Sequence, residues 1–384
     1  MMSSGKLAWL QLRRQKVRLG IAVAGVAFAA LLIFMQLGFQ EALFKSAVTV
    51  HGKLRADLVL ISPQSAYLVA MKPFPRRRLH QAAGFDGVEE IMPVYIGMGA
   101  FKNPETGRSR SIFVLGFDPA DDAIGMEAVD SQRTVIRYPD RVLFDSAARP
   151  EFGPVASTVE TGETVTTEIN GRSIQIVDLF RMGTSFGIDG TVITSDSNFF
   201  RMFPNVPPGL LTMGLIRLEP EADPESIRTA IDDVLPGDVE VLTMEQYMNR
   251  EIDYWASATP IGYVFTFGTI MGLVVGAIIV YQILFADISD HLEEYATLKA
   301  MGYSNGFLVR VVLMEALILA FTGFLPGLLI AWQLYGLTAE ATLLPMAISP
   351  RIAATVLALT VVMCWVSGLL ALRKVRTADP AEIF

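Results

Sequence analysis

The sequence predicts an α-helical membrane protein with four spans and a large α+β domain inserted between the first and second spans. Three observations indicate this fold class. Four stretches of the chain contain no Asp, Glu, Lys or Arg, and about 210 residues with strand-like patterns separate the first two. The composition, 52% hydrophobic and 18% charged over 384 residues, is also too apolar for a soluble protein of this length.

The charge-free stretches cover residues 19–40, 254–286, 316–339 and 352–372. Each is long enough to span a membrane, because about 20 helical residues cross a hydrocarbon core about 30 Å thick. The first follows a basic leader, as a signal peptide would. Its apolar run is longer than that of a signal peptide and no clear cleavage site follows, so we expect an uncleaved anchor.

Lys and Arg near the span ends are more numerous on the side of the leader, which predicts that both termini are cytoplasmic. The large inserted domain then lies outside. The expected segments are a cytoplasmic leader (1–18), span one, extended outward as a stalk (19–41), the outer domain (42–253), span two (254–286), a cytoplasmic loop (287–305), span three (306–333), a short outer loop (334–350), span four (351–372) and a cytoplasmic tail (373–384).

The outer segment contains short β-rich runs separated by turn residues, and a few helix signals. Asp223-Pro224 is typical of a helix start, and Thr243 with Gln246 forms a capping-box pattern. We expect the second helix to continue through Tyr254 into span two, and residues 41–52 to extend span one. The expected strands are 57–61, 111–117, 164–169, 173–177, 191–194, 211–218 and 239–242.

Several kinds of chemistry are excluded or disfavoured. There is no G-x-x-x-x-G-K-[ST] motif, so the chain should not hydrolyse nucleotide through a P-loop. The net charge of −8 disfavours nucleic-acid binding. One cysteine and three scattered histidines predict no disulfide, metal or cofactor. Ser185 lies in a G-x-S-x-G pattern, but the only later histidine, His291, falls across the membrane, so we interpret it as a glycine-rich turn.

Glycines in two spans predict close helix packing, because a glycine lets a neighbouring helix approach. They line either an interface within the chain or a seam with a second copy, and Pro326 between two of them suggests a kink. The five positions are Gly268, Gly272 and Gly276 in span two, and Gly323 and Gly327 in span three.

Two charged features have a structural and a functional interpretation. Glu315, the single acid near the start of span three, is expected to form a salt bridge with Arg310 or Lys299 rather than to carry protons. The basic cluster at residues 76–78 is expected to be a solvated helix face, and the alternative is contact with an acidic partner or with lipid headgroups.

The loop between spans two and three predicts an amphipathic helix. Ile288, Leu292, Tyr295, Leu298 and Met301 recur at spacings of three and four residues. Gly302 stands where a helix C-cap is expected. Such a helix can lie in the membrane interface, or it can fit a groove on a soluble partner.

This loop, with the run EYATLKAMGYS at residues 294–304, resembles the MacB/FtsX-like permeases of ABC transporters. The layout of one outer domain after the first span and three clustered spans at the end is similar too. The runs GTSFGIDGT at 183–191, EALILA at 315–320 and GFLPG at 323–327 resemble the DevC subfamily, whose members are permeases of an exporter. The resemblance covers essentially the whole chain.

The resemblance implies a homodimeric permease of the bacterial inner membrane with a MacB-like periplasmic domain. That domain would have a porter-like part built from both ends of the segment and a subdomain inserted between. A separate cytoplasmic ATPase would drive it, and a periplasmic membrane-fusion adaptor and a TolC-like outer-membrane protein would complete the export path. The residues implied in ATPase coupling are Leu292, Glu294, Tyr295, Thr297, Leu298, Lys299, Met301 and Gly302.

Other functions share parts of this pattern. Within the family, an FtsX-like regulator or a lipoprotein-release subunit would transmit motion without exporting cargo. A sensory receptor shares the span–domain–span layout, but it needs a long cytoplasmic region after span two, where this chain has only about 20 residues. A membrane-anchored hydrolase lacks a suitably placed histidine.

Overall fold

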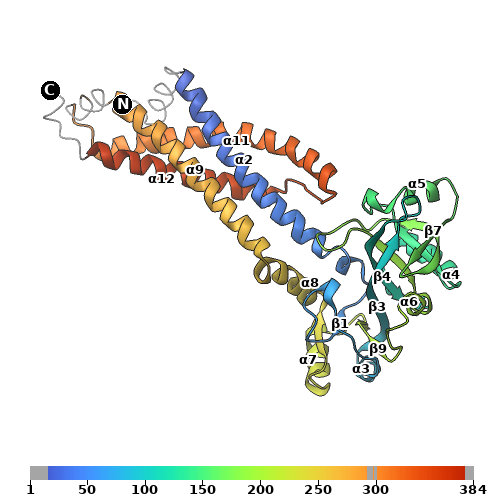
Figure 1. Cartoon of the computed structure of the whole chain (residues 1–384). Coiled ribbons are helices and arrows are strands. Elements are labelled where there is room, and N and C mark those ends of the chain that lie inside the picture. Colours follow the sequence, from blue (N-terminus) through green and yellow to red (C-terminus); the bar gives the residue numbers. More distant parts are fainter. Residues whose placement is uncertain (1–15, 292–296, 298–300, 377–384) are drawn as a thin grey trace. The chain divides into compact units, whose positions relative to one another are not determined.

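The computed structural model describes residues 16–291, 297 and 301–376, and the chain divides into two compact units (Figure 1). One, here called the helical unit, comprises the chain up to residue 42, residues 260–342 and the chain from 346 onward. The other, the sheet unit, comprises residues 43–259 and 343–345. The chain therefore passes between the units after residues 42, 259, 342 and 345.

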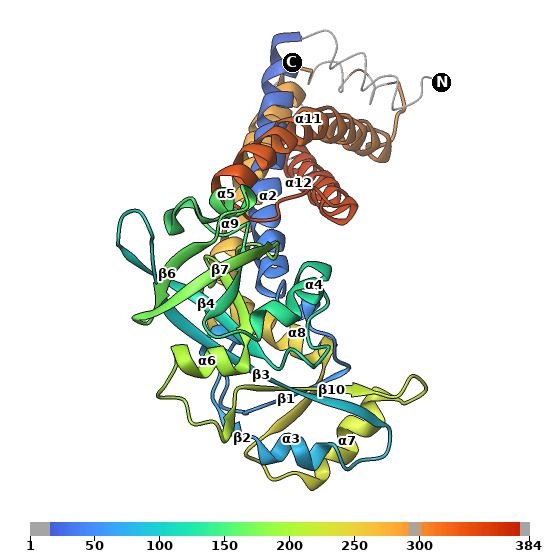
Figure 2. The ribbon, with the colours of Figure 1, turned by 90° about the vertical axis from the view of Figure 1, so that its right-hand side faces the viewer.

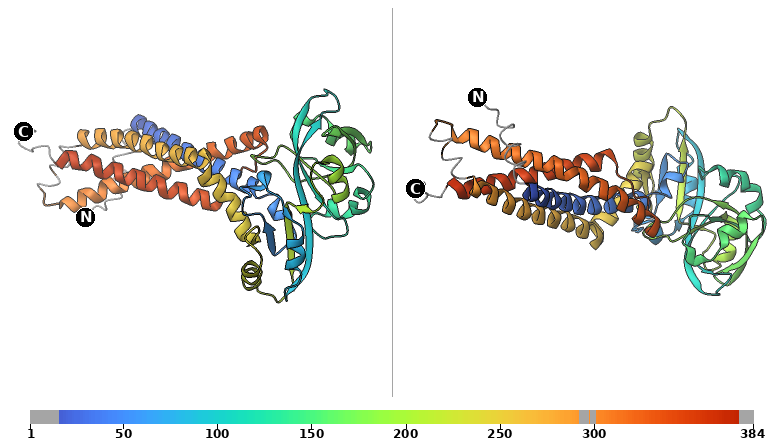
Figure 3. Two further views of the ribbon diagram at one scale, coloured as in Figure 1. Left: turned by 60° about the horizontal axis from the view of Figure 1, so that its bottom comes forward. Right: turned by 90° about the horizontal axis from the view of Figure 1, so that it is seen from above.

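The helical unit confirms the four expected spans. Its long helices are α2 (Lys16–Ala47), α9 (Pro260–Asp290), α11 (Asn305–Thr342) and α12 (Pro350–Arg376). Each is long and apolar enough to cross a membrane, and the four run alongside one another (Figure 3). Small and branched side chains from all four form one core, including Val26, Leu284, Val312 and Cys364.

Two helices in this part of the chain extend beyond the spans expected from the sequence. Helix α11 continues nine residues past 333, so most of the expected outer loop at 334–350 is helical. The charge of Glu340 limited the apolar stretch in the sequence, but the alanines beside it favour helix and no proline stops it. Helix α12 likewise extends to Arg376, because its basic last residues are good helix formers.

The sheet unit contains a nine-stranded sheet in the order β11-β1-β10-β3-β4-β8-β5-β7-β6, and a two-stranded pair β2–β9. The strands are β1 (Leu58–Ile61), β2 (Phe74–Pro75), β3 (Val88–Lys102), β4 (Ser109–Phe117), β5 (Arg141–Asp145), β6 (Val165–Ile169), β7 (Arg172–Phe180), β8 (Thr191–Ser195), β9 (Leu210–Leu211), β10 (Met213–Leu218) and β11 (Glu240–Thr243). The helices are α3 (Arg77–Ala82), α4 (Glu127–Ile136), α5 (Val155–Glu160), α6 (Asp196–Met202), α7 (Pro224–Val234) and α8 (Met244–Asp253).

The sheet has a first half, made of β11, β1 and β10, and a second half, made of β4, β8, β5, β7 and β6. The long strand β3 lies between them and belongs to both. Its first half pairs with β10, and its second half pairs with β4. Its end also pairs with β6, so β3, β4, β8, β5, β7 and β6 form a closed ring. Strands β1, β10 and β11 come from the two ends of the segment, and the ring is inserted between them. This division matches the expected part built from both ends with an inserted subdomain.

Strand alternation explains how the first half of the sheet is covered on both faces. Leu58 and Leu60 of β1 join the core that includes α3 and α7, and these two helices lie beside that half of the sheet (Figure 2). Val59 and Ile61 point to the opposite face, where they join a second core with Tyr247 of α8.

The sequence did not predict β3 or β5. Strand β3 contains Pro93, Gly97 and Gly99, which normally indicate a break in a strand. The tertiary structure requires the two glycines, because a Cβ would lie 2.9 Å from the Phe203 ring at Gly97 and 2.6 Å from Ile169 Cγ2 at Gly99. Strand β5 is a short apolar run between charged residues, which gives a weak signal.

The expected continuous helix from Thr243 into span two is wrong. The capping box at Thr243 and Gln246 is present, and it starts α8 as expected. A π-helical turn, η4 (Tyr254–Ala258), follows α8, and Thr259 is then extended, with φ −116° and ψ 156°. Pro260 explains the break, because the residue before a proline is disfavoured in the helical region. The other expected extension, over residues 41–52, is confirmed only as far as Ala47, where α2 ends.

Candidate functional site

The predicted coupling segment is only partly described. Leu292, Glu294, Tyr295, Leu298 and Lys299 lie outside the described residues. Of the remaining predicted positions, the carbonyl of Thr297 accepts a hydrogen bond of 3.0 Å from the amide of Met301. Gly302 has φ +90°, as a C-cap glycine does, and the Met301 side chain is 63% exposed. An exposed methionine at the end of a helical turn is suited to contact with a partner.

The glycines predicted in span two face α2. A Cβ at Gly268 would overlap the side chain of Gln36, and one at Gly272 would lie 3.4 Å from Ile33. At Gly276 it would overlap the sulfur of Met363 in α12 and lie 2.5 Å from the Cβ of Ala29, so this glycine faces both helices. These positions therefore allow α9 and α2 of one chain to approach closely.

The glycines predicted in span three face the same helix. A Cβ at Gly323 would lie 2.5 Å from the Cβ of Val26, and one at Gly327 would lie 2.9 Å from the carbonyl oxygen of Ala27. Pro326 lies between them inside α11, which continues as one helix. Helix α2 is thus the element against which all five predicted glycines pack.

The expected salt bridge of Glu315 is not formed with Arg310. The Glu315 side chain has no exposed surface, and neither carboxyl oxygen has a hydrogen-bond partner among the described residues. Arg310 is exposed, since positions five residues apart on a helix are rotated by about 140° and face different sides. Lys299, the other expected partner, lies outside the described residues.

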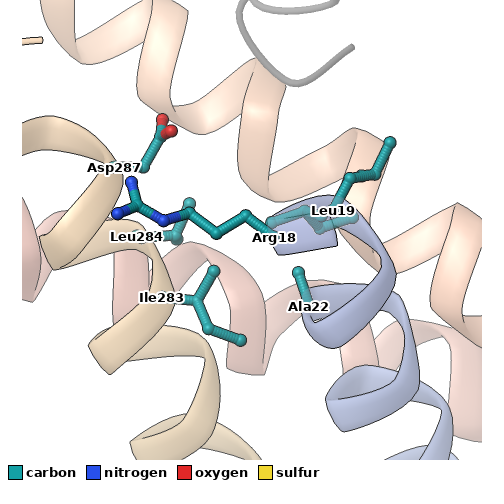
Figure 4. Close-up of a pocket in the computed structure, with 7 residues that line it drawn as sticks. Arg18, Leu19, Ala22, Ile283, Leu284 and Asp287 are labelled. Atoms are coloured by element: carbon teal, nitrogen blue, oxygen red, sulfur yellow. The ribbon is translucent and has the colours of Figure 1, made fainter. Parts of the chain in front are cut away.

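A small gap between α2, α9 and α11 is lined mostly by apolar side chains, with Arg18 and Asp287 as its polar members (Figure 4). Arg18 of α2 forms an ion pair with Asp290 at the end of α9, and its side chain extends toward Asp287. The Nδ1 atom of His291 lies 2.9 Å from the carbonyl oxygen of Asp287. Asp287 and His291 are both nearly buried.

A second buried polar group holds the end of α8 in the sheet unit. The carboxylate of Glu251 accepts a hydrogen bond of 3.0 Å from Trp255 Nε1 and one of 2.8 Å from the amide of Leu68. His51 Nε2 lies 3.8 Å from the same carboxylate, and the His51 ring packs against Tyr247. These contacts join the chain that follows α2 to the π-helical turn before span two.

Burial sets the ionisation of this group. It lowers the pKa of His51 to about 4, so the imidazole is neutral at pH 7. It also raises the pKa of Glu251, and the hydrogen bonds from Trp255 and Leu68 oppose that increase. The pKa of the Tyr247 hydroxyl is raised for the same reason. Apart from the spacing of four residues between Glu251 and Trp255, no pattern in the sequence predicts this group.

The loop with the G-x-S-x-G pattern is a tight turn, which agrees with our interpretation. The backbones of Ser185 and Ile188 are hydrogen-bonded to each other. Both oxygens of Asp145 accept backbone amides at the start of the loop, from Met182 and Gly183. The hydroxyl of Thr184 donates a hydrogen bond of 3.1 Å to the carbonyl of Leu343, in the connection between α11 and α12.

The basic cluster at residues 76–78 is partly used within the chain. Arg78 forms a bidentate ion pair with Asp238 at 3.0–3.1 Å, and it also donates to Gln81. Arg77 is exposed at the start of α3. Among the described residues, no group of three His, Cys, Asp or Glu side chains is placed to hold a metal ion.

Comparison with known proteins gives matches along the chain. Residues 266–380 match the family described as FtsX-like permease C-terminal. Two proteins described as uncharacterized ABC transporter permeases, from the CDC 1551 and H37Rv strains of Mycobacterium tuberculosis, are each 24% identical over 386 residues. Those alignments cover 98% of this chain and 97% of each relative.

Two solved structures show weaker similarity. The periplasmic region of MacB from Actinobacillus actinomycetemcomitans is 9% identical, with a TM-score of 0.35, over 51% of this chain and 92% of that one. The extracellular domain of the ABC-type transporter YknZ from Gram-positive bacteria is 10% identical, with a TM-score of 0.32, over 48% of this chain and 99% of that one.

Proposed function

We propose that this chain, which has an FtsX-like permease C-terminal domain at residues 266–380, is the transmembrane subunit of an ABC transporter. It would transmit an ATP-driven movement from a cytoplasmic ATPase to its sheet unit. The family match at residues 266–380 is the observation that supports this function most directly. The similarity to two ABC transporter permeases over almost the whole chain agrees with it.

The energy would come from a separate subunit. The sequence has no P-loop, so we propose that the chain is not itself an ATPase. The ATPase would bind the segment 288–302, where Met301 is exposed beside the C-cap Gly302. An exposed apolar side chain on a short helix can fill a groove on a soluble partner.

The two connections around the inserted domain would have different mechanical roles. Helix α2 continues without a break from its apolar span to Ala47, so a tilt at one end displaces the other. The second connection is interrupted at Thr259, just before Pro260, and the π-helical turn before it is held by Trp255 and Glu251. We propose that α2 transmits the movement and that Thr259–Pro260 acts as a hinge.

The finer assignment follows the resemblance to DevC-type exporters. The chain would lie in the bacterial inner membrane as a homodimer, with both termini cytoplasmic and the sheet unit in the periplasm. A periplasmic adaptor and an outer-membrane duct would complete the export path. The alternative is an FtsX-like or lipoprotein-release subunit that transmits motion without export, and the FtsX-like family match supports it equally. Binding of a periplasmic adaptor protein to the sheet unit would favour export over this alternative.

Co-purification from native membranes tests the central proposal. Leu298→Asp and Met301→Asp should each abolish association with the ATPase, because a charge replaces the apolar side chain that the partner buries. Val234→Asp is the matched control, since Val234 is 68% exposed and lies in the sheet unit. Retention of the ATPase by both segment variants, at the level of the control, would contradict the proposal.

A further inference from the structure

Glu315 is buried inside the helical unit without a partner for its charge. Its side chain has no exposed surface, and both carboxyl oxygens lack a hydrogen-bond partner among the described residues. Its neighbours on the same face of α11, Val312, Ala316 and Leu319, are buried and apolar. An ionised carboxylate in such surroundings is strongly disfavoured unless a cation compensates it.

The neighbouring helices bring apolar groups and a second acid to this region. A Cβ at Gly368 of α12 would lie within 3.6 Å of Val312, Ala316 and Leu284, so α9, α11 and α12 meet at this level. Asp287 of α9, which is also nearly buried, is a second acid that faces the region between α9 and α11. Burial, with apolar and acidic neighbours rather than a described cation, therefore disfavours an ionised carboxylate at Glu315.

The basic residues described near this region are engaged elsewhere or face away. Arg18 of α2 is paired with Asp290, and its side chain extends toward Asp287 (Figure 4). His291 is bound through Nδ1 to the Asp287 carbonyl. Arg310 is exposed on another side of α11. Within the described part of α12, the basic residues with described side chains, Arg351 and Arg373, lie at its ends.

We propose that Glu315 is a proton-binding site, and that it is a neutral carboxylic acid in this packed arrangement of α9, α11 and α12. Before the helices close, a carboxylate oxygen takes a proton from a hydronium ion, which leaves as water. When the helices separate and water reaches the group, the O–H bond breaks and the proton passes back to water. Packing of the helical unit is thereby linked to binding of one proton. The inference goes beyond the proposed function, because transmission of ATP-driven motion requires no proton.

Infrared spectroscopy of the full chain in lipid nanodiscs, without an ATPase, tests this directly. The parent at neutral pH should show the C=O stretching band of a protonated carboxylic acid, and Glu315→Gln should lose it. Glu340→Gln is the matched control, since Glu340 is an exposed acid on the same helix, and it should keep the band. An unchanged spectrum in Glu315→Gln would overturn the proposal, because the group would then be ionised or bound to a cation.

Thermal unfolding gives a second measurement that does not depend on spectroscopy. Glutamine has nearly the size and the charge of a protonated glutamate, so Glu315→Gln should shift the midpoint by less than about 2 °C. Glu315→Ala should lower it further, because it leaves a cavity. A midpoint in Glu315→Gln as low as in Glu315→Ala would contradict the proposal. Neither measurement involves the ATPase, so failure of the proposed function would leave both results interpretable.

Discussion

Gly323 lies so close to α2 that one added methyl group should weaken the packing of the helical unit. In Gly323→Ala the new Cβ would lie 2.5 Å from the Cβ of Val26 and 3.2 Å from the backbone nitrogen of Ala27. Carbon atoms pack best at about 3.5–4.0 Å, so the pair is about 1–1.5 Å too close. Neither contact atom can rotate away, because one is a Cβ and the other is backbone. Helix α2 must therefore shift.

The expected cost is about 1–3 kcal/mol, as for other overpacked cores. Replacing glycine by alanine also favours helix by about 1 kcal/mol, which would partly hide the effect. Gly336→Ala, also in α11, provides the matched control, because a Cβ at Gly336 would meet nothing within 4 Å. The difference in stability between the two variants should therefore give the overpacking cost by itself.

Reversible unfolding of both variants and the parent in one mixed-micelle condition measures this difference. We expect Gly336→Ala to be as stable as the parent or more stable, and Gly323→Ala to be less stable than Gly336→Ala by about 1–3 kcal/mol. Equal stability of the two variants would refute the reasoning, because the close approach of α2 would then be absent. An effect that appears only as a change in dimerisation would place Gly323 at a seam between copies.

Three further predictions concern the sheet unit of the full chain. Trp255→Phe should cost about 1–2 kcal/mol in chemical unfolding, because it leaves the buried Glu251 without its indole donor, and an unchanged midpoint would argue against that bond. The pKa of His51 is lowered from 6.5 to about 4, so between these values the unfolded chain binds a proton that the buried imidazole does not. The free energy of unfolding should therefore be highest above pH 6.5 and fall by about 3 kcal/mol as pH drops toward 4. His51→Asn should flatten that part of the profile of unfolding midpoint against pH, and parallel profiles would contradict the assignment. Burial and neighbouring acids raise the pKa of Asp121 from 3.8 to about 6, so the stability that the protonated side chain contributes is lost as pH rises through 6. Asp121→Asn should therefore stabilise the chain by about 1–2 kcal/mol at pH 8 and hardly at all at pH 3.5. Thermal unfolding midpoints at the two pH values measure this difference.

Local signals in the sequence predicted the starts of α7 and α8 and much of the strand content of the sheet unit. Asp223 caps α7 and Thr243 caps α8, because the side-chain oxygen of each accepts a hydrogen bond from the backbone amide three residues later. These features depend on neighbours in the chain, so the sequence is sufficient to predict them. Strand β3 depends instead on Phe203 and Ile169, which are distant in sequence and need glycines opposite them. No local pattern indicates such a requirement.

In the candidate site, too, the sequence predicted local features, and the fold determined which residues meet. The glycine spacing predicted close packing in spans two and three, but only the fold identifies α2 as the partner helix. The group of Glu251, Trp255 and His51 joins parts of the chain about 200 residues apart, and no motif relates them.

By itself, the sequence determined that the chain crosses a membrane four times and that an α+β domain is inserted after the first crossing. Those features follow from the hydrophobic effect, which acts on each apolar stretch independently of the rest of the chain. Only the tertiary structure decided that the helix before span two breaks at Thr259 and that Glu315 is buried without Arg310. The physical reason is that helix breaks and charge partners depend on which side of a helix faces a neighbour, and that is fixed only when the elements pack together.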